Sequence, residues 1–184
     1  DLSTLDGTTG FRLDGIDASD LSGRSVSSAG DVNGDGFDDL IIGAYRADAG
    51  GTDTSEGESY VVFGKSSGFT AAIDLSALNG TDGFRLDGID AYDESGRSVS
   101  SAGDVNGDGF DDLIIGASSA DPGGDSSAGE SYVVFGKSGG FGSAVDLSTL
   151  DGTTGFRLDG IDADDRSGRS VSSAGDVNGD GFDD

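Results

Sequence analysis

The sequence contains no cysteine, histidine, methionine or tryptophan, and only one proline. Without cysteine and histidine there is no thiolate nucleophile, no disulfide framework, no zinc site of the usual nitrogen and sulfur kind, and no imidazole base. No apolar run approaches the roughly 18 residues of a transmembrane helix, and no signal-peptide pattern opens the chain. Because methionine is absent, we expect the chain to be a processed product or an excerpt of something longer.

Basic residues are scarce: 10 Lys and Arg accompany 36 Asp and Glu, which gives a formal charge of −26 at pH 7. Such a surface repels nucleic acid and anionic membranes, so neither is an expected partner and no membrane insertion is expected. The hydrophobic fraction is only 33%, whereas glycine supplies 35 residues. We therefore expect many tight turns, short strands and something that neutralises carboxylates.

One unit recurs about two and a half times along the chain. An Asp-Leu-Ser-(Thr or Ala)-Leu segment begins at positions 1, 74 and 146, and an Asp-Val-Asn-Gly-Asp-Gly-Phe-Asp-Asp segment begins at positions 31, 104 and 176. The offsets are therefore 73 and 72 residues. The one-residue difference lies in the loop between Gly43 and Glu58, whose counterpart runs from Gly116 to Glu130.

Each unit contains four short strand-like runs separated by Gly, Asp, Asn and Ser, in the first unit at 25–29, 40–42, 59–63 and 84–89. No helical stripe exceeds about one turn, although residues 75–78 could form a single turn. Four strands at this period are typical of the blade of a β-propeller. The sequence predicts an all-β fold of four-stranded antiparallel blades in an incomplete ring. The alternatives are a stacked β-solenoid or a string of small sandwiches.

The predicted organisation follows the repeats. Residues 1–23 form the outer strand and turn of a preceding blade, 24–96 a first blade, 97–168 a second blade, and 169–184 the start of a third. Two complete blades cannot close a ring, because propellers need about four to eight. We therefore expect the chain to belong to a longer repeat array, or to pack with other repeats or copies that cover its open strand edges.

The repeated Asp/Asn loop has the chemistry of a calcium site. Oxygen-bearing side chains stand at loop positions 1, 3, 5 and 9, and the glycine at position 6 allows the carbonyl of position 7 to point inward. Ca²⁺ binds six to eight oxygens in a flexible cage, whereas Mg²⁺ prefers a strict octahedron. The predicted ligands are Asp31, Asn33, Asp35, the Phe37 carbonyl and Asp39 at 31–39; Asp104, Asn106, Asp108, the Phe110 carbonyl and Asp112 at 104–112; and Asp176, Asn178, Asp180, the Phe182 carbonyl and Asp184 at 176–184.

The same loop pattern has two other interpretations, a solvated turn and an EF-hand. A single Asp/Asn/Gly cluster can be a solvated turn, but three identical copies between strand-like runs favour the metal site. An EF-hand needs a bidentate Glu at position 12 and flanking helices, whereas position 12 here is Ile42 or Ile115 and the flanks are strand-like. The EF-hand is therefore excluded.

The repeat resembles the FG-GAP repeat over essentially the whole chain. The resemblance rests on Asp-Val-Asn-Gly-Asp-Gly-Phe-Asp-Asp-Leu-Ile-Ile-Gly-Ala, preceded by Gly-Arg-Ser-Val-Ser-Ser-Ala-Gly and followed by Glu-Ser-Tyr-Val-Val-Phe-Gly. Such repeats build the β-propeller of integrin α subunits and occur in large secreted bacterial proteins. The segment Gly-Glu-Ser-Tyr-Val-Val-Phe-Gly-Lys resembles sequences of the bacterial branch of the family. One departure is Ser22-Gly23, with its repeats, where the family usually has Phe-Gly.

The resemblance implies an arrangement of the strands. Inner strands A lie around Val26, Val99 and Val171; strands B at 40–44 and 113–117; strands C at 60–63 and 132–135; and outer strands D at 11–16, 84–89 and 156–161. The metal loop then joins A to B, and the B–C and D–A loops share the opposite face. The family resemblance implies that an extracellular protein or glycan ligand docks on that B–C loop face.

Two further recurring features have open interpretations. Asp17 and Asp20, repeated as Asp90/Asp93 and Asp162/Asp165, form either a second cation site or turn caps on an acidic surface. Arg24 and its repeats Arg97 and Arg169 are expected to pair with carboxylates of neighbouring blades.

Two classes of function follow. The first is a calcium-binding repeat module of an extracellular or cell-surface protein, with a structural or adhesive role through protein or glycan contacts or self-assembly. The second is the propeller portion of a secreted carbohydrate-active enzyme, such as a polysaccharide lyase or hydrolase. The sequence favours the non-enzymatic module, because almost every polar residue is repeated whereas a catalytic base is unique. A pair of carboxylates with raised pKa values outside the three loops would favour the enzyme.

Overall fold

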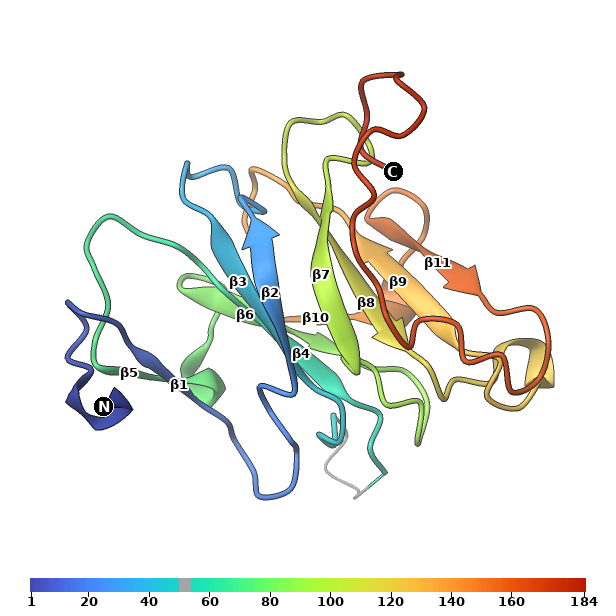
Figure 1. Cartoon of the computed structure of the whole chain (residues 1–184), viewed down its shortest axis with the longest axis horizontal. Helices are drawn as coiled ribbons and strands as arrows, with labels where there is room; N and C mark the ends of the chain where they lie inside the picture. Colours follow the sequence, from blue (N-terminus) through green and yellow to red (C-terminus); the bar gives the residue numbers. More distant parts are fainter. Residues whose placement is uncertain (50–53) are drawn as a thin grey trace.

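The computed structural model describes residues 1–49 and 54–184, in which nearly all regular structure is β (Figure 1). The first repeat supplies β2 (Ser25–Gly30), β3 (Asp39–Ala44), β4 (Glu58–Val62) and β6 (Gly83–Asp87). The second supplies β7 (Ser98–Gly103), β8 (Asp112–Ala117), β9 (Glu130–Val134) and β11 (Gly155–Asp159). Each set pairs antiparallel in chain order. Two four-stranded blades of an incomplete β-propeller are therefore confirmed.

Both faces of the first blade are apolar, because other segments pack against it on each side. In β3, Ile41 faces the second blade and Ile42 faces the opposite way, and both are buried. The continuous run Leu-Ile-Ile, rather than a strict alternation, is the sequence sign of a strand buried on two sides. Burying a side chain of this size contributes about 1.5–3 kcal/mol.

The main core lies between the two blades. From the first blade it takes Ile41, Val61, Phe84 and Leu86, and from the second it takes side chains that include Val99, Leu113, Ile115, Tyr132 and Val134. A smaller core packs the other face of the first blade, around Ile42, Tyr60 and Val62, against Leu13, which precedes the blade, and against apolar side chains at 69–78, between β4 and β6. The repeats are thus joined by hydrophobic contact between blades.

Two predicted strands differ clearly from the structure, and two observed strands were not predicted. No strand forms around Val171, so that prediction was wrong: no described segment forms a ladder with residues 171–174, and a strand needs a neighbour to satisfy its backbone groups. The outer strand expected at 11–16 is the shorter β1 (Arg12–Asp14), which pairs with β5 (Ala72–Asp74). The sequence reading missed β5 and β10 (Ala144–Asp146), which run parallel to β1 and β6 respectively.

Short helical turns complete the chain. They are η1 (Leu2–Thr4), η2 (Leu75–Ala77), η3 (Pro122–Gly124) and η4 (Leu147–Thr149). The single turn expected at 75–78 is confirmed as η2. An aspartate precedes η1, η2 and η4 and accepts a hydrogen bond from the serine N–H two residues on, as an N-cap does.

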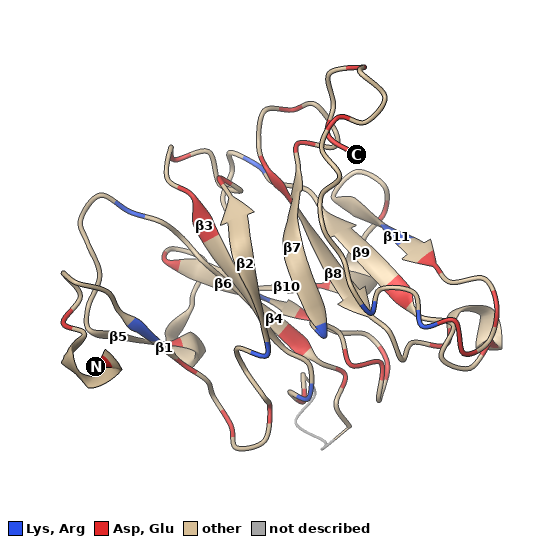
Figure 2. Ribbon diagram, in the orientation of Figure 1, with Lys and Arg blue, Asp and Glu red and all other residues tan. Residues whose placement is uncertain are grey.

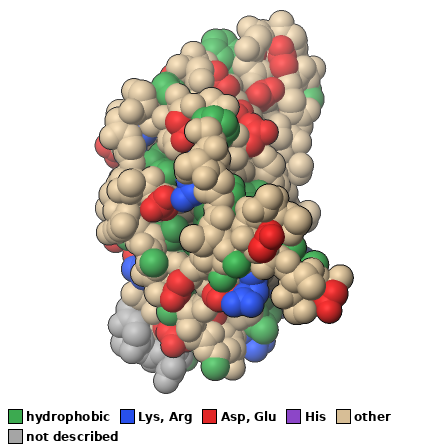
Figure 3. All heavy atoms as spheres, turned by 90° about the vertical axis from the view of Figure 1, so that its left-hand side faces the viewer, with side chains coloured by type: hydrophobic (Ala, Val, Ile, Leu, Met, Phe, Trp, Pro, Cys, Tyr) green, Lys and Arg blue, Asp and Glu red, His purple; other side chains and the backbone are tan. Residues whose placement is uncertain are grey.

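Acidic residues lie in many of the loops at both ends of the strands (Figure 2). On the face at the left of Figure 1, apolar side chains are interrupted by acidic and basic ones (Figure 3). The B–C loop of the first blade, predicted to belong to the docking face, includes residues 50–53, which lie outside the described residues.

Candidate metal centre

Each Asp/Asn loop is folded by its own acidic side chains. Asp31 Oδ1 accepts hydrogen bonds from the N–H of Gly34 (2.8 Å) and Asp35 (3.0 Å), and its Oδ2 accepts one from Gly36 (2.8 Å). Gly34 and Gly36 have φ of 75° and 87°, a region that favours glycine. The spacing of Asp and Gly therefore specifies a tight turn.

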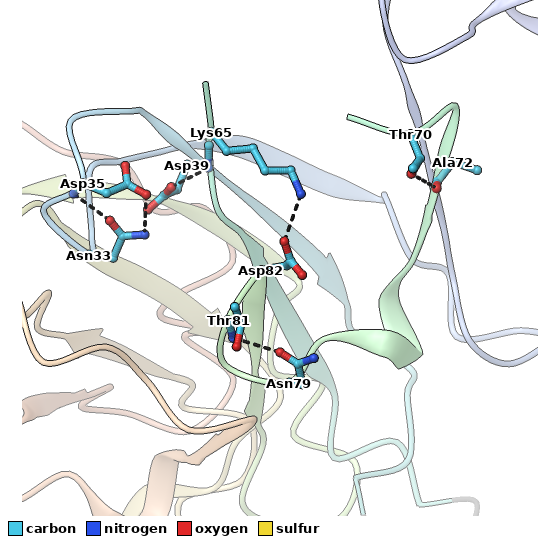
Figure 4. A network of polar contacts seen from close by, with 10 residues as sticks. Asn33, Asp35, Asp39, Lys65, Thr70, Ala72, Asn79, Thr81 and Asp82 are labelled. Atoms are coloured by element: carbon cyan, nitrogen blue, oxygen red, sulfur yellow. Dashed lines mark hydrogen bonds and ion pairs between the residues drawn. The ribbon is translucent and has the colours of Figure 1, made fainter. Parts of the chain in front are cut away.

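Positions 3 and 5 continue the turn. Asn33 Oδ1 accepts from the N–H of Asp35 (2.8 Å), and Asp35 Oδ1 accepts from the N–H of Phe37 (2.9 Å). The Asn33 amide donates to the second oxygen of Asp35 (3.1 Å). Figure 4 shows Asn33, Asp35 and Asp39 close together on one side of the loop.

Position 9 forms the buried base of the loop. The Asp39 side chain is buried, and it accepts hydrogen bonds from the N–H of Val32 (3.1 Å) and Gly64 (2.8 Å). Burial raises the pKa of Asp39 to about 7, and the nearby negative charges of Asp35 and Asp31 also raise it. The adjacent Lys65 does not neutralise it, because its ammonium pairs with Asp82 at 2.9 Å (Figure 4).

The second and third loops repeat this geometry. Asp104 and Asp176 accept the same three backbone hydrogen bonds as Asp31. Burial also raises the pKa of Asp112 to about 6. Asp184, in contrast, is exposed, so the third loop has the turn but not the buried base.

The donor chemistry of the loops fits a hard cation, although the carboxylates do not converge on one point. Among the described residues, no group of three acidic side chains is close enough to hold a metal ion as it stands. The oxygens instead accept hydrogen bonds from the backbone of the same loop. Carboxylate, amide and carbonyl oxygens are nonetheless the ligands that Ca²⁺ uses, and Asp39 and Asp112 are buried acids with no ion pair in the described part.

Position 8 links neighbouring loops, which the sequence reading missed. Asp111 Oδ2 accepts a hydrogen bond from the N–H of Asp31 (2.8 Å), and the Asp111 N–H donates to the Asp31 carbonyl (3.3 Å). Asp183 repeats both contacts on Asp104, at 3.1 and 3.2 Å. The identical Asp-Asp pair at positions 8 and 9 was the available signal, but the partner lies 80 residues away.

Replacing Asp111 is expected to weaken the junction between the loops. Asp111→Ala should lower the free energy of unfolding by about 1–3 kcal/mol, because a hydrogen bond to a charged acceptor is lost. Urea denaturation followed by circular dichroism measures the change. Asp38→Ala is the matched control, since Asp38 is the exposed counterpart in the first loop and accepts no hydrogen bond from another described loop. Equal losses in the two variants would contradict the linking role.

The aspartates of the first D–A turn, Asp17 and Asp20, line a separate acidic cavity. A cavity of about 510 Å³ is lined by residues that include Asp17, Asp20, Asp48, Glu58 and Arg85. The Asp17 N–H donates to Asp20 Oδ2 (3.2 Å), and Asp162 and Asp165 repeat the contact, which favours turn caps. Burial raises the pKa of Asp20 and of Glu58.

The second D–A turn gives a pH-dependent expectation. Burial raises the pKa of Asp93 to about 7, and the charges of Asp90, Glu130 and Asp121 add to the shift. The folded chain therefore holds this proton more tightly than the unfolded chain, so the free energy of unfolding falls as pH rises from about 4 to about 7. Asp93→Asn should remove this fall and raise stability at pH 8 by roughly 2–4 kcal/mol, because one pKa unit is about 1.4 kcal/mol.

Urea denaturation at pH 5 and pH 8 measures this change. The matched control is Asp165→Asn, which changes the exposed counterpart in the third turn. A gain that is the same at the two pH values would contradict the buried-carboxyl explanation.

Among the recurring arginines, Arg97 forms an ion pair with Glu94, which belongs to residues 24–96 of the preceding blade. Its guanidinium also lies 5.0 Å from the ring centroid of Tyr45 in that blade, a cation–π contact. The expected pairing of Arg97 with a carboxylate of a neighbouring blade is therefore confirmed.

The geometry agrees with comparisons to known proteins. A family model described as "FG-GAP repeat" matches residues 22–62 and 95–134, which span β2–β4 and β7–β9 with their Asp/Asn loops. The chain carries FG-GAP repeats. It is also similar to integrin alpha-5 of Xenopus laevis, with 31% identity over 133 residues. That match covers 71% of this chain and 11% of the length of the integrin.

Each FG-GAP match includes one Asp/Asn loop together with three strands of one blade. Each matched segment begins before an inner strand and ends in the third strand of the same blade. In the described part of the chain, no helix has the length and apolar character needed to cross a membrane.

Proposed function

We propose that the chain is a calcium-stabilised FG-GAP module of an extracellular or cell-surface protein, with a structural or adhesive role. The observation that carries this proposal is the threefold repetition of one Asp/Asn loop, with a buried and unneutralised aspartate at its base in the two complete blades. Bound Ca²⁺ would neutralise charge that the chain's 10 basic residues cannot. Its ligands would be the side chains at positions 1, 3, 5 and 9 and the carbonyl at position 7.

The extracellular setting follows from the same chemistry. Sites of extracellular modules have Kd values of about 10⁻⁴–10⁻³ M, and these sites fill only where calcium is near millimolar. The integrin relative supports the same setting. An origin in the bacterial branch stays a prediction, as does docking of a protein or glycan ligand on the B–C loop face.

Labelling of intact cells tests this proposal. An antibody against residues 1–184 of the parent protein should label unpermeabilised cells, and protease added outside should cleave the module faster after calcium is chelated. Labelling that requires permeabilised cells, or cleavage that chelation leaves unchanged, would contradict the proposal.

The carbohydrate-active alternative requires a carboxylate pair outside the loops, and Asp20 with Glu58 meets that description. The two side chains line one cavity and have raised pKa values. The Glu58 carboxylate, however, forms an ion pair with Arg85 and accepts a hydrogen bond from the Tyr60 hydroxyl. A buried aspartate with a raised pKa also recurs in the next D–A turn, at Asp93. A catalytic pair would be present once, so we propose a non-enzymatic module.

A further inference from the structure

The outer edge of each blade's last strand is built to receive a short parallel strand. β5 pairs with β1 in the register Arg12 to Ala72, and β10 pairs with β6 in the register Arg85 to Ala144. In each case the arginine N–H donates to the carbonyl just before the added strand, at 3.0 Å. The added strand comes from the next repeat, so this pairing joins consecutive blades.

The added strand belongs to a longer pattern. Its sequence is Phe-x-x-Ala-(Ile or Val)-Asp-Leu, at 69–75 and again at 141–147. Phe69 stacks on Phe11 with ring centroids 4.2 Å apart, and Phe141 stacks on Phe84 at 4.0 Å. The leucine after the strand is buried in both copies, as the first residue of η2 and η4.

The third such edge, that of β11, is paired with no strand in the described part of the chain. β11 lies at the end of its sheet (Figure 1). Phe156 and Leu158 are 37% and 49% exposed, whereas their counterparts Phe84 and Leu86 are fully buried. Phe156 has an edge contact with Phe135 at 5.9 Å and no stacked ring among the described residues.

We propose that the outer edge of β11 binds an extended segment of the pattern Phe-x-x-Ala-(Ile or Val)-Asp-Leu, supplied by a further repeat of the same kind. The segment would run parallel to β11, accept a hydrogen bond from the Arg157 N–H, and stack its phenylalanine on Phe156. The two internal junctions carry this inference, because they form the same contacts with the same residue types. Pairing of an exposed strand edge with an extended segment is a general mode of peptide recognition.

A synthetic peptide with the sequence of residues 141–150 tests the proposal on the full chain. Amide chemical shifts of ¹⁵N-labelled protein should change saturably at Arg157, Leu158 and Asp159 as peptide is added to millimolar concentration. The proposal extends the function proposed above by naming a partner segment. Circular dichroism of the same calcium-containing sample should show a folded chain, so that a failure of the edge is distinguishable from a failure of calcium binding.

Two controls define the site. Proline in place of Val145 in the peptide should abolish the shift changes, because it removes an N–H and blocks strand pairing. In the protein, Phe156→Ser should weaken binding by about tenfold or more, since loss of a stacked aromatic contact and its buried area exceeds about 1.4 kcal/mol. Ile161→Ser, which changes a more exposed apolar residue of the same segment, should leave binding unchanged.

Other outcomes would overturn the proposal. These are no shift change at millimolar peptide, equal binding of the proline peptide, or changes that map away from β11. A dimer of the chain that is lost on Phe156→Ser would assign the edge to a second copy instead. Sedimentation velocity of the unmixed protein measures that outcome.

Discussion

Chelation of calcium is expected to lower the melting temperature of the chain by roughly 10–20 °C. A site at a calcium concentration 100 times its Kd adds about 2.7 kcal/mol to the free energy of unfolding, and the two complete blades each contain one loop. At this chain length each kcal/mol shifts the melting temperature by about 2–4 °C. Differential scanning calorimetry measures the effect, with excess chelator and with about 10 mM calcium, which is 100 times a Kd of about 10⁻⁴ M.

A loop variant localises this stabilisation. Asp108→Ala removes a predicted ligand and also the hydrogen bond to the Phe110 N–H, so the decisive quantity is the calcium-dependent part of the melting temperature. That part should fall by about half. Asp125→Ala removes an exposed acid outside the loops and should leave it unchanged. If excess chelator leaves the melting temperature unchanged, calcium does not stabilise the chain.

Gly43→Ala is expected to lower the free energy of unfolding by about 3 kcal/mol or more, which is roughly 6–12 °C at this size. Gly43 lies in β3, where an added Cβ would be 2.0 Å from the backbone carbonyl oxygen of Gly96, in the turn that leads into β7 of the second blade. Because that neighbour is backbone, the blades must separate. Gly116 faces Gly168 in the same way.

The matched control for this variant is Gly139→Ala. An added Cβ at Gly139 meets no atom within 4 Å, and its backbone is not in the left-handed region. Thermal melts of the two variants at saturating calcium compare them. If Gly43→Ala melts like the wild-type chain, the blades do not approach as described.

The blade strands could be predicted because their signals are local. β3 and β8 are continuous apolar runs, and β4 and β9 are β-branched and aromatic. The Asp/Asn loops were also evident, because their hydrogen bonds close within five residues. Repetition strengthened each signal by showing it two or three times.

Contacts between repeats could not be predicted in the same way. β5 and β10 are three residues long, and their partners lie about 60 residues earlier in the chain. The hydrogen bonds between Asp111 and Asp31 likewise join residues that are far apart in the sequence. Sequence periodicity reports which face of a strand is apolar, but it does not report which distant backbone will meet it.

Calorimetric titration of Ca²⁺ into the decalcified chain tests the central claim most directly. The account predicts saturable binding at the loops, with two ions in the complete blades, a third at 176–184, and Kd values of about 10⁻⁴–10⁻³ M or somewhat tighter. Asp108→Ala should remove one ion, and Mg²⁺ at the same concentration should compete poorly. No binding of Ca²⁺ at millimolar concentration, or a stoichiometry unchanged by Asp108→Ala, would contradict the account.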